Sequence, residues 1–65
     1  MTWNYRLMTN NGEIAVYEVY YRTDGSVEGW SATPVFPQAN SLLEFTEDLK
    51  LYCDAINLPI LEYTD

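Results

Sequence analysis

The N-terminal third of the chain alternates apolar and polar positions in the pattern of a β-hairpin. Residues 3–9, WNYRLMT, place large apolar side chains at every second position, which is the period of a half-buried strand. Residues 14–22, IAVYEVYYR, are rich in β-branched and aromatic residues and are typical of a central strand. Asn11 and Gly12 lie between them, and Asn-Gly is the strongest short signal for a hairpin turn.

A second turn signal, Asp24-Gly25, predicts that the chain folds back once more. The third strand is expected over residues 27–33. It must stop by Pro34, because proline has no N–H to donate to a strand ladder. The first half of the sequence therefore predicts an antiparallel three-stranded meander.

A helix start is marked by Ser41 and Glu44, which have the spacing of a capping box. Asn57 should end the helix, since the residue before Pro59 is driven out of the helical region. The last residues, LPILEYTD, then run off as an extended tail that forms either a fourth strand or a flap over the sheet edge. A stripe expected to face the core consists of Leu42, Phe45, Leu49, Tyr52, Cys53 and Ile56, which fall within about 100° of arc.

The predicted architecture is thus a single α+β domain, residues 1–65: a three-stranded antiparallel meander with one C-terminal helix packed on one face. Two-residue turns would set Leu7 opposite Val16 and Tyr20 opposite Gly29. We expect the helix to cover the sheet face that gathers Trp3, Tyr5, Leu7, Ile14, Val16, Tyr20 and Val27. Glu18 is a charged residue on this largely apolar face. We expect it to lie at the rim of the face or to be hydrogen-bonded to a tyrosine hydroxyl.

The opposite sheet face is the first candidate interface. One helix cannot cover both sides of a sheet, so this face is expected to be an open aromatic platform. Tyr and Trp are also the residues most enriched in binding hot spots. Two alternatives stay open: the tail residues Ile60, Leu61 and Tyr63 half cover this face, or a three-residue loop in either hairpin swaps the two faces. The face carries Met8, Tyr17, Val19, Tyr21 and Trp30, beside Arg6 and Glu28.

Composition limits both stability and chemistry. A chain of 65 residues buries only about 60% of its unfolded surface, so dimerisation or burial against a larger partner is expected. Its one cysteine, Cys53, cannot form an internal disulfide, and without any histidine a closed zinc site is not expected. We expect Cys53 to be a buried structural thiol and not a nucleophile, because no histidine is present to activate it. No calcium loop, phosphate-binding loop or dinucleotide motif is present, so we expect neither an enzyme nor a cofactor.

The charge is strongly negative. Ten acidic residues stand against Arg6, Arg22 and Lys50, a net −7. This balance disfavours direct binding to nucleic acid or an anionic membrane and favours a cationic partner, although it also serves solubility alone. The second candidate interface is the outer helix face, where carboxylates spaced like nucleic-acid phosphates surround an apolar residue. This face consists of Glu44, Glu47, Asp48, Leu51 and Asp54, with Glu28, Glu62 and Asp65 expected nearby.

The expected location is the cytoplasm, either bacterial or that of a host cell if the protein is phage-encoded. WNYRL follows Met1-Thr2 without the basic region and apolar run of a secretory signal. No apolar run is long enough to span a bilayer. An unpaired cysteine also suits a reducing compartment.

Several segments resemble those of a group of short, uncharacterised bacterial proteins, for which no activity is implied. The matching residues are Met1 to Arg6, Tyr17 to Tyr21, Asp24-Gly25, Trp30, Pro34, Ala55, Pro59 and Leu61, which together span nearly the whole chain. Three strands followed by an S/T-x-x-E helix are similar in topology to the sheet-and-helix domain of HicB-type antitoxins, although no added DNA-binding module is present. In size and charge alone, the chain is similar to anti-CRISPR proteins that imitate DNA.

Two functions follow as hypotheses. The favoured one is a non-enzymatic inhibitor that blocks the basic nucleic-acid-binding surface of a partner protein through the acidic helix, by mimicry of DNA. The alternative is an antitoxin-like or regulatory subunit that binds a protein partner through the aromatic sheet face. Both predict a protein partner and no direct contact with nucleic acid or membrane.

Overall fold

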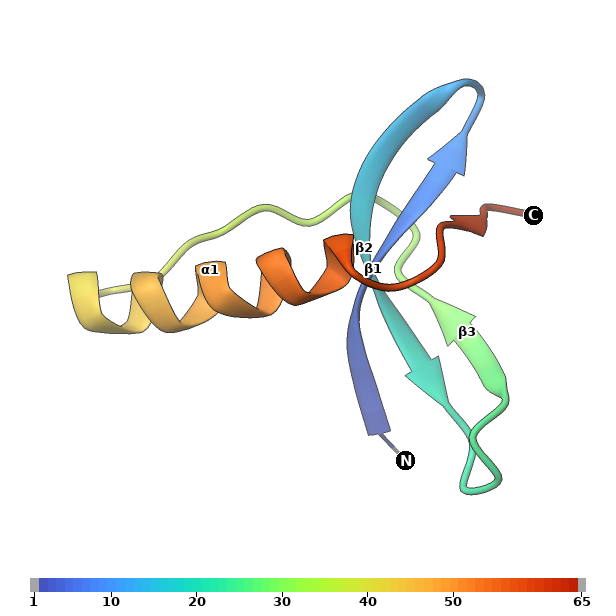
Figure 1. Cartoon of the computed structure of the whole chain (residues 1–65), viewed down its shortest axis with the longest axis horizontal. Coiled ribbons are helices and arrows are strands. Elements are labelled where there is room, and N and C mark those ends of the chain that lie inside the picture. The colour runs from blue at the N-terminus through green and yellow to red at the C-terminus, as the bar shows by residue number, and fades with distance from the viewer. Residues whose placement is uncertain (1, 65) are drawn as a thin grey trace.

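The computed structural model describes residues 2–64 and contains a four-stranded mixed sheet with one helix (Figure 1). The strands are β1 (Thr2–Asn10), β2 (Glu13–Tyr21), β3 (Val27–Trp30) and β4 (Leu61–Glu62), and the helix α1 is Leu42–Ile56. Their order in the sheet is β3-β2-β1-β4. The three predicted strands and the helix are present. The tail adds the fourth strand, which runs parallel to β1, so the sheet is not purely antiparallel.

The first hairpin has the predicted register. Asn11 and Gly12 both adopt positive φ, at 53° and 84°, as the two central residues of a tight hairpin turn require. Leu7 therefore pairs with Val16, and the alternation of faces along β1 and β2 is as predicted.

The second hairpin is longer than the two-residue turn that we expected. The Arg22 N–H donates to the Ser26 carbonyl at 2.8 Å, which leaves a three-residue loop over 23–25. A bulge at Tyr20/Tyr21 then restores the register, so Val19 still pairs with Trp30. The bulge moves Val27 from its predicted face to the opposite one, where it packs against the core. The strand itself ends at Trp30, before the predicted position 33.

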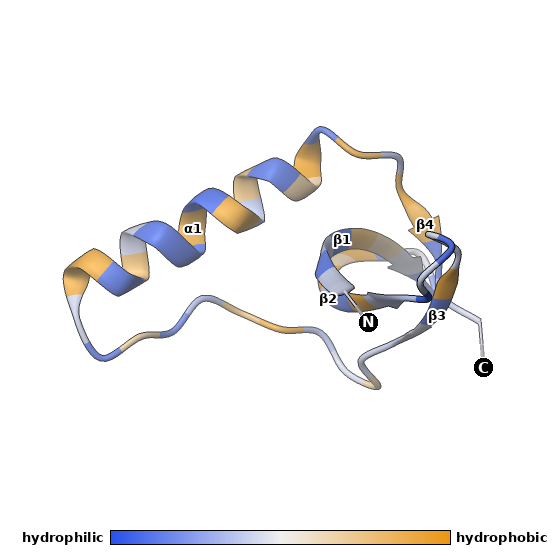
Figure 2. Ribbon diagram, turned by 90° about the horizontal axis from the view of Figure 1, so that it is seen from below, coloured by the Kyte–Doolittle hydropathy of each residue, from blue (hydrophilic) through white to orange (hydrophobic). Residues whose placement is uncertain are grey.

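The core lies on the sheet face that we expected to be an open platform, so that prediction is wrong. Met8 and Val19 are fully buried, and Tyr17 is only 2% exposed. The sheet is strongly curled (Figure 2). Although β3 and β4 are opposite edges of the sheet, the rings of Trp30 and Tyr63 lie 5.8 Å apart.

A curled sheet can thus bury one face without a helix, because its two edges approach each other across the concave side. Leu61 and Tyr63 from the tail complete the packing, which confirms the alternative in which the tail covers this face. Ile60, which we expected beside them, is 51% exposed. The Tyr63 hydroxyl also donates to the Ala32 carbonyl at 3.3 Å and so closes the curl.

Arg6 fixes the segment that follows the helix. Its guanidinium donates to the Tyr21 hydroxyl at 3.1 Å and to the Pro59 carbonyl at 2.7 Å. The Tyr21 hydroxyl donates in turn to Asn4 at 2.7 Å. This network spans more than fifty residues of sequence and holds the C-terminal end of α1 against β1.

The helix begins and ends as predicted but is rotated relative to the prediction. Ser41 caps it by accepting from the Glu44 N–H at 3.2 Å, and Asn57 ends it. The helix projects away from the sheet, and only its C-terminal part lies against the strands (Figure 1). Of the helix residues only Ala55 is buried, whereas Cys53, predicted to be a buried thiol, is exposed.

Candidate functional site: the exposed helix and its cleft

Twelve of the fifteen residues of helix α1 fall into three sectors, which follow from its rotation of about 100° per residue. The sheet-facing sector is half-buried to buried and consists of Phe45, Asp48, Tyr52 and Ala55. The second sector, which we name the apolar stripe, lies about 90° around the helix from the sheet-facing sector. It consists of Leu42, Leu49, Cys53 and Ile56, all exposed. The third, the acidic sector, consists of Glu44, Glu47, Leu51 and Asp54, also all exposed.

Tyr5 makes the principal contact between the sheet and the helix. Its ring lies 4.3 Å from that of Tyr52, between centroids, and 5.2 Å from that of Trp3. Its hydroxyl donates to Asp48 Oδ1 at 3.1 Å. Burial, together with the hydrogen bond to this carboxylate, raises the pKa of Tyr5 far above its usual range. Asp48, predicted to lie on the open acidic face, is therefore a half-buried structural residue.

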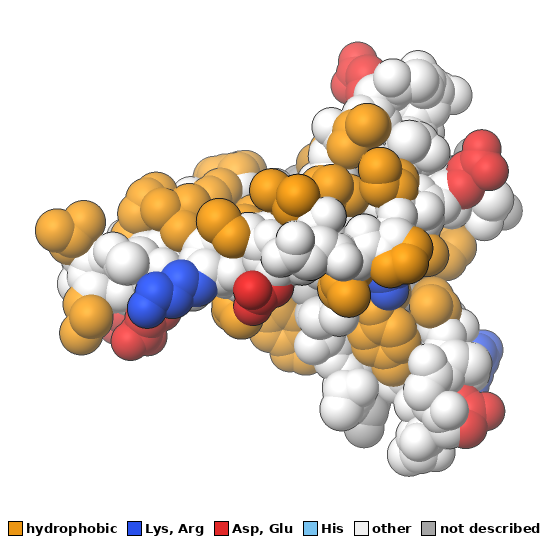
Figure 3. All heavy atoms as spheres, in the orientation of Figure 1, with side chains coloured by type: hydrophobic (Ala, Val, Ile, Leu, Met, Phe, Trp, Pro, Cys, Tyr) orange, Lys and Arg blue, Asp and Glu red, His pale blue; other side chains and the backbone are white. Residues whose placement is uncertain are grey.

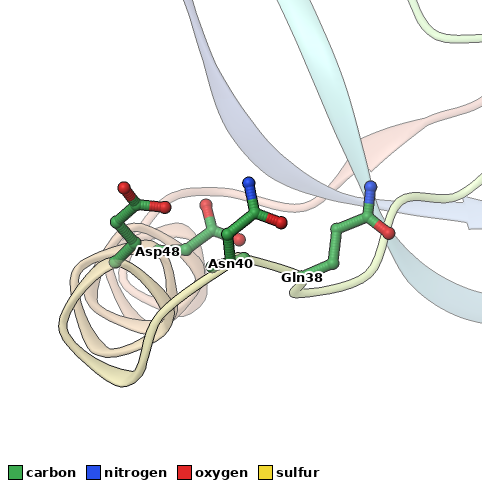
Figure 4. Close-up of a pocket in the computed structure, with 5 residues that line it drawn as sticks. Gln38, Asn40 and Asp48 are labelled. Carbon is green, nitrogen blue, oxygen red and sulfur yellow. The ribbon is translucent and has the colours of Figure 1, made fainter.

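A polar cleft runs between α1 and the connection that precedes it. One part, of about 510 Å³, is lined by Glu44 and Asp48 from the helix and by residues 38–40 from the connection. Figure 4 shows Asp48, Asn40 and Gln38 projecting on the same side. A second part, of about 330 Å³, shares Gln38 and Asp48 and extends to Glu18.

Two of the three carboxylates of this cleft, Asp48 and Glu18, receive hydrogen bonds from tyrosines. Tyr20 donates to Glu18 Oε1 at 2.9 Å, which confirms the prediction that Glu18 meets a tyrosine hydroxyl. That bond raises the pKa of Tyr20. The arginines are engaged elsewhere: Arg6 donates to Pro59, and Arg22 donates to Val27 in its own hairpin. The helix side of the molecule therefore keeps a negative potential.

The structure separates the residues that we predicted to bind a partner. Glu44, Glu47, Leu51 and Asp54 lie together on the helix and are exposed, and Glu28 is exposed on β3. The aromatic group does not form a surface, because Tyr17 is buried and Tyr21 and Trp30 are half-buried around it. The sequence analysis assigned the four residues of the apolar stripe to the core, together with Phe45 and Tyr52, which do face the sheet.

Within residues 2–64, no cluster of three or more metal-ligating side chains is found. The same part of the chain contains no helix that is long and apolar enough to cross a membrane.

No known protein family, curated protein or solved structure was found to match this chain. The resemblances noted in the sequence therefore stay expectations, and the helix surface is the basis for a functional assignment.

Proposed function

We propose that this protein is a non-enzymatic inhibitor that places the acidic sector of α1 on the basic, nucleic-acid-binding surface of a partner protein. The observation that supports this proposal is the exposure of Glu44, Glu47 and Asp54 on a helix that projects from the sheet (Figure 1). A projecting helix can enter a groove that a flat sheet face cannot enter.

The spacing of the acidic sector suits a surface that binds phosphates. Glu44 and Glu47 are about 4.5 Å apart along the helix axis, and Glu47 and Asp54 about 10.5 Å. Leu51, 49% exposed, lies between them and offers an apolar contact next to the charges. The net charge of −7 would steer the protein towards a basic groove and keep it from nucleic acid itself.

The alternative function, an antitoxin-like subunit that binds through the aromatic sheet face, is disfavoured. Its central residue, Tyr17, is 2% exposed and packs against Tyr63 at 5.4 Å between ring centroids. Binding through this face would require the tail to detach and the core to open.

The test uses the protein as bait in a bacterial lysate, followed by binding measurements on the captured protein. We expect a nucleic-acid-binding protein that duplex DNA displaces from the bait, with affinity that falls as salt rises. A variant with Glu44→Gln, Glu47→Lys and Asp54→Lys should lose at least about tenfold in affinity. Glutamine is chosen at position 44 because it retains the capping pattern.

The matched control makes the same charge changes on the strands, as Glu13→Gln, Glu28→Lys and Glu62→Lys. These positions are exposed, so both variants should fold as judged by far-UV circular dichroism. Equal losses in the two variants would show that net charge alone drives binding. A partner that DNA does not displace would contradict the mimicry of nucleic acid.

A further inference from the structure

Within residues 2–64, the apolar stripe of α1 is left exposed. Leu42 is 81% exposed, Ile56 67% and Leu49 38%, and Cys53 between them is exposed. Figure 3 shows apolar side chains along the upper edge of the helix. An isolated helix of this length is only marginally stable in water, so its outer half needs packing that the sheet does not supply.

The apolar positions of the stripe nearly coincide with themselves when the direction of the helix is reversed about its midpoint. Leu49 is the midpoint of Leu42–Ile56, with an apolar residue seven positions away on either side. Phe45 lies four positions before it and Cys53 four positions after it. A second helix laid antiparallel across Leu49 would therefore set Leu42 against Ile56 and Phe45 against Cys53. Such self-complementarity is what a two-fold symmetric dimer requires.

We propose that the apolar stripe is covered by a second copy of this chain, with the two helices antiparallel about Leu49.

The exposed area is sufficient for such a dimer. A folded monomer of 7.5 kDa exposes about 4,200 Å² on average. This chain exposes 4835 Å². The excess is about 600 Å² per copy, and two copies that bury it would form an interface of about 1,200 Å², the lower end of the range for stable association.

Charge also favours a second copy over a basic partner at this stripe. No carboxylate belongs to the stripe, and Lys50 flanks it about 90° from its centre. A basic partner would meet this lysine at the edge of the stripe. The acidic sectors of both copies would stay free. The dimer and the proposed inhibitor surface therefore use different sides of the same helix.

Sedimentation equilibrium of the purified protein tests the proposal. We expect a monomer–dimer equilibrium that shifts towards dimer as salt rises, since screening weakens the repulsion between two copies of charge −7. Binding to a basic partner should change with salt in the opposite direction. Dimerisation is measured with this chain alone. Failure of the dimer proposal can therefore be distinguished from failure of the proposed function.

Leu49→Gln should raise the dimer dissociation constant at least about tenfold. Leu51→Gln is the matched control, because Leu51 is exposed on the acidic sector and should leave the dimer intact. Ile56→Gln, at a 67% exposed position, gives a second variant if the first folds poorly by circular dichroism.

Cys53 supplies an independent measurement. Its reaction with a maleimide should slow as protein concentration rises in the wild type, and this dependence should vanish in Leu49→Gln. A wild type that stays monomeric at high concentration and high salt would overturn the proposal. So would a dimer that Leu51→Gln dissociates and Leu49→Gln does not. Capture of another protein through the stripe of a monomeric chain would assign the stripe to that protein instead.

Discussion

Replacing Met8 with alanine tests whether the concave side of the sheet is the core. Met8 is fully buried, beside Tyr17 and Val19. The substitution removes three heavy atoms, at about 0.8 kcal/mol for each buried methylene equivalent. The cavity left behind adds to this loss, so the expected cost is about 2–5 kcal/mol. A domain of this size has a total stability of about 3–10 kcal/mol, and the variant should lose a large part of it.

Urea unfolding measures this cost, followed by tryptophan fluorescence and far-UV circular dichroism. Both proteins must be compared at one concentration, because dimerisation would add to the apparent stability. The matched control is Ile14→Ala in the same hairpin, at a position 59% exposed on the convex face. It should cost less than about 1 kcal/mol. Equal costs at the two positions, or a larger cost at Ile14, would refute the assignment of the core.

Two further predictions concern Tyr5 and the first turn. The fold raises the pKa of Tyr5 above its unfolded value of about 10, so the unfolded chain loses this proton first and stability should fall as pH rises beyond that value. The stability of Tyr5→Phe, measured by urea unfolding across the same pH range, should fall less steeply. Parallel curves for the two proteins would show that the fold does not raise the pKa of Tyr5. Gly12→Ala should cost about 1 kcal/mol because φ is +84° there, whereas Gly29→Ala meets open space and should be nearly neutral in the same assay.

Local sequence signals were sufficient for the first hairpin, its register and the two ends of the helix. Asn11-Gly12 can adopt the two positive φ values of a tight turn, and this fixes which residues of β1 and β2 face each other. Ser41 and Asn57 mark the ends of the helix through contacts with residues a few positions away. Such signals are readable because all the interacting groups lie close together in the chain.

The burial of the sheet face was decided only by the tertiary structure. Both faces of β1 and β2 carry large aromatic side chains, so alternation alone could not show which one is covered. Contact between the opposite edges decides it, through Trp30 and Tyr63, whose approach depends on the curl of the whole sheet. A bulge in the second hairpin, which moved Val27 to the core, adds to this curl and is not visible in a turn signal of two residues.

The orientation of the helix was also beyond the sequence. The predicted core-facing stripe joined the four residues of the apolar stripe to Phe45 and Tyr52, which do face the sheet. The side of the helix that meets the sheet is fixed by Tyr5 and Asp48 and by the bond from Arg6 to Pro59. These contacts join residues 43 and 53 positions apart. The sequence determines that α1 is amphipathic, because that depends on helical periodicity alone. Only the tertiary structure determines that the stripe stays exposed, because the rotation of a helix about its axis depends on distant anchors.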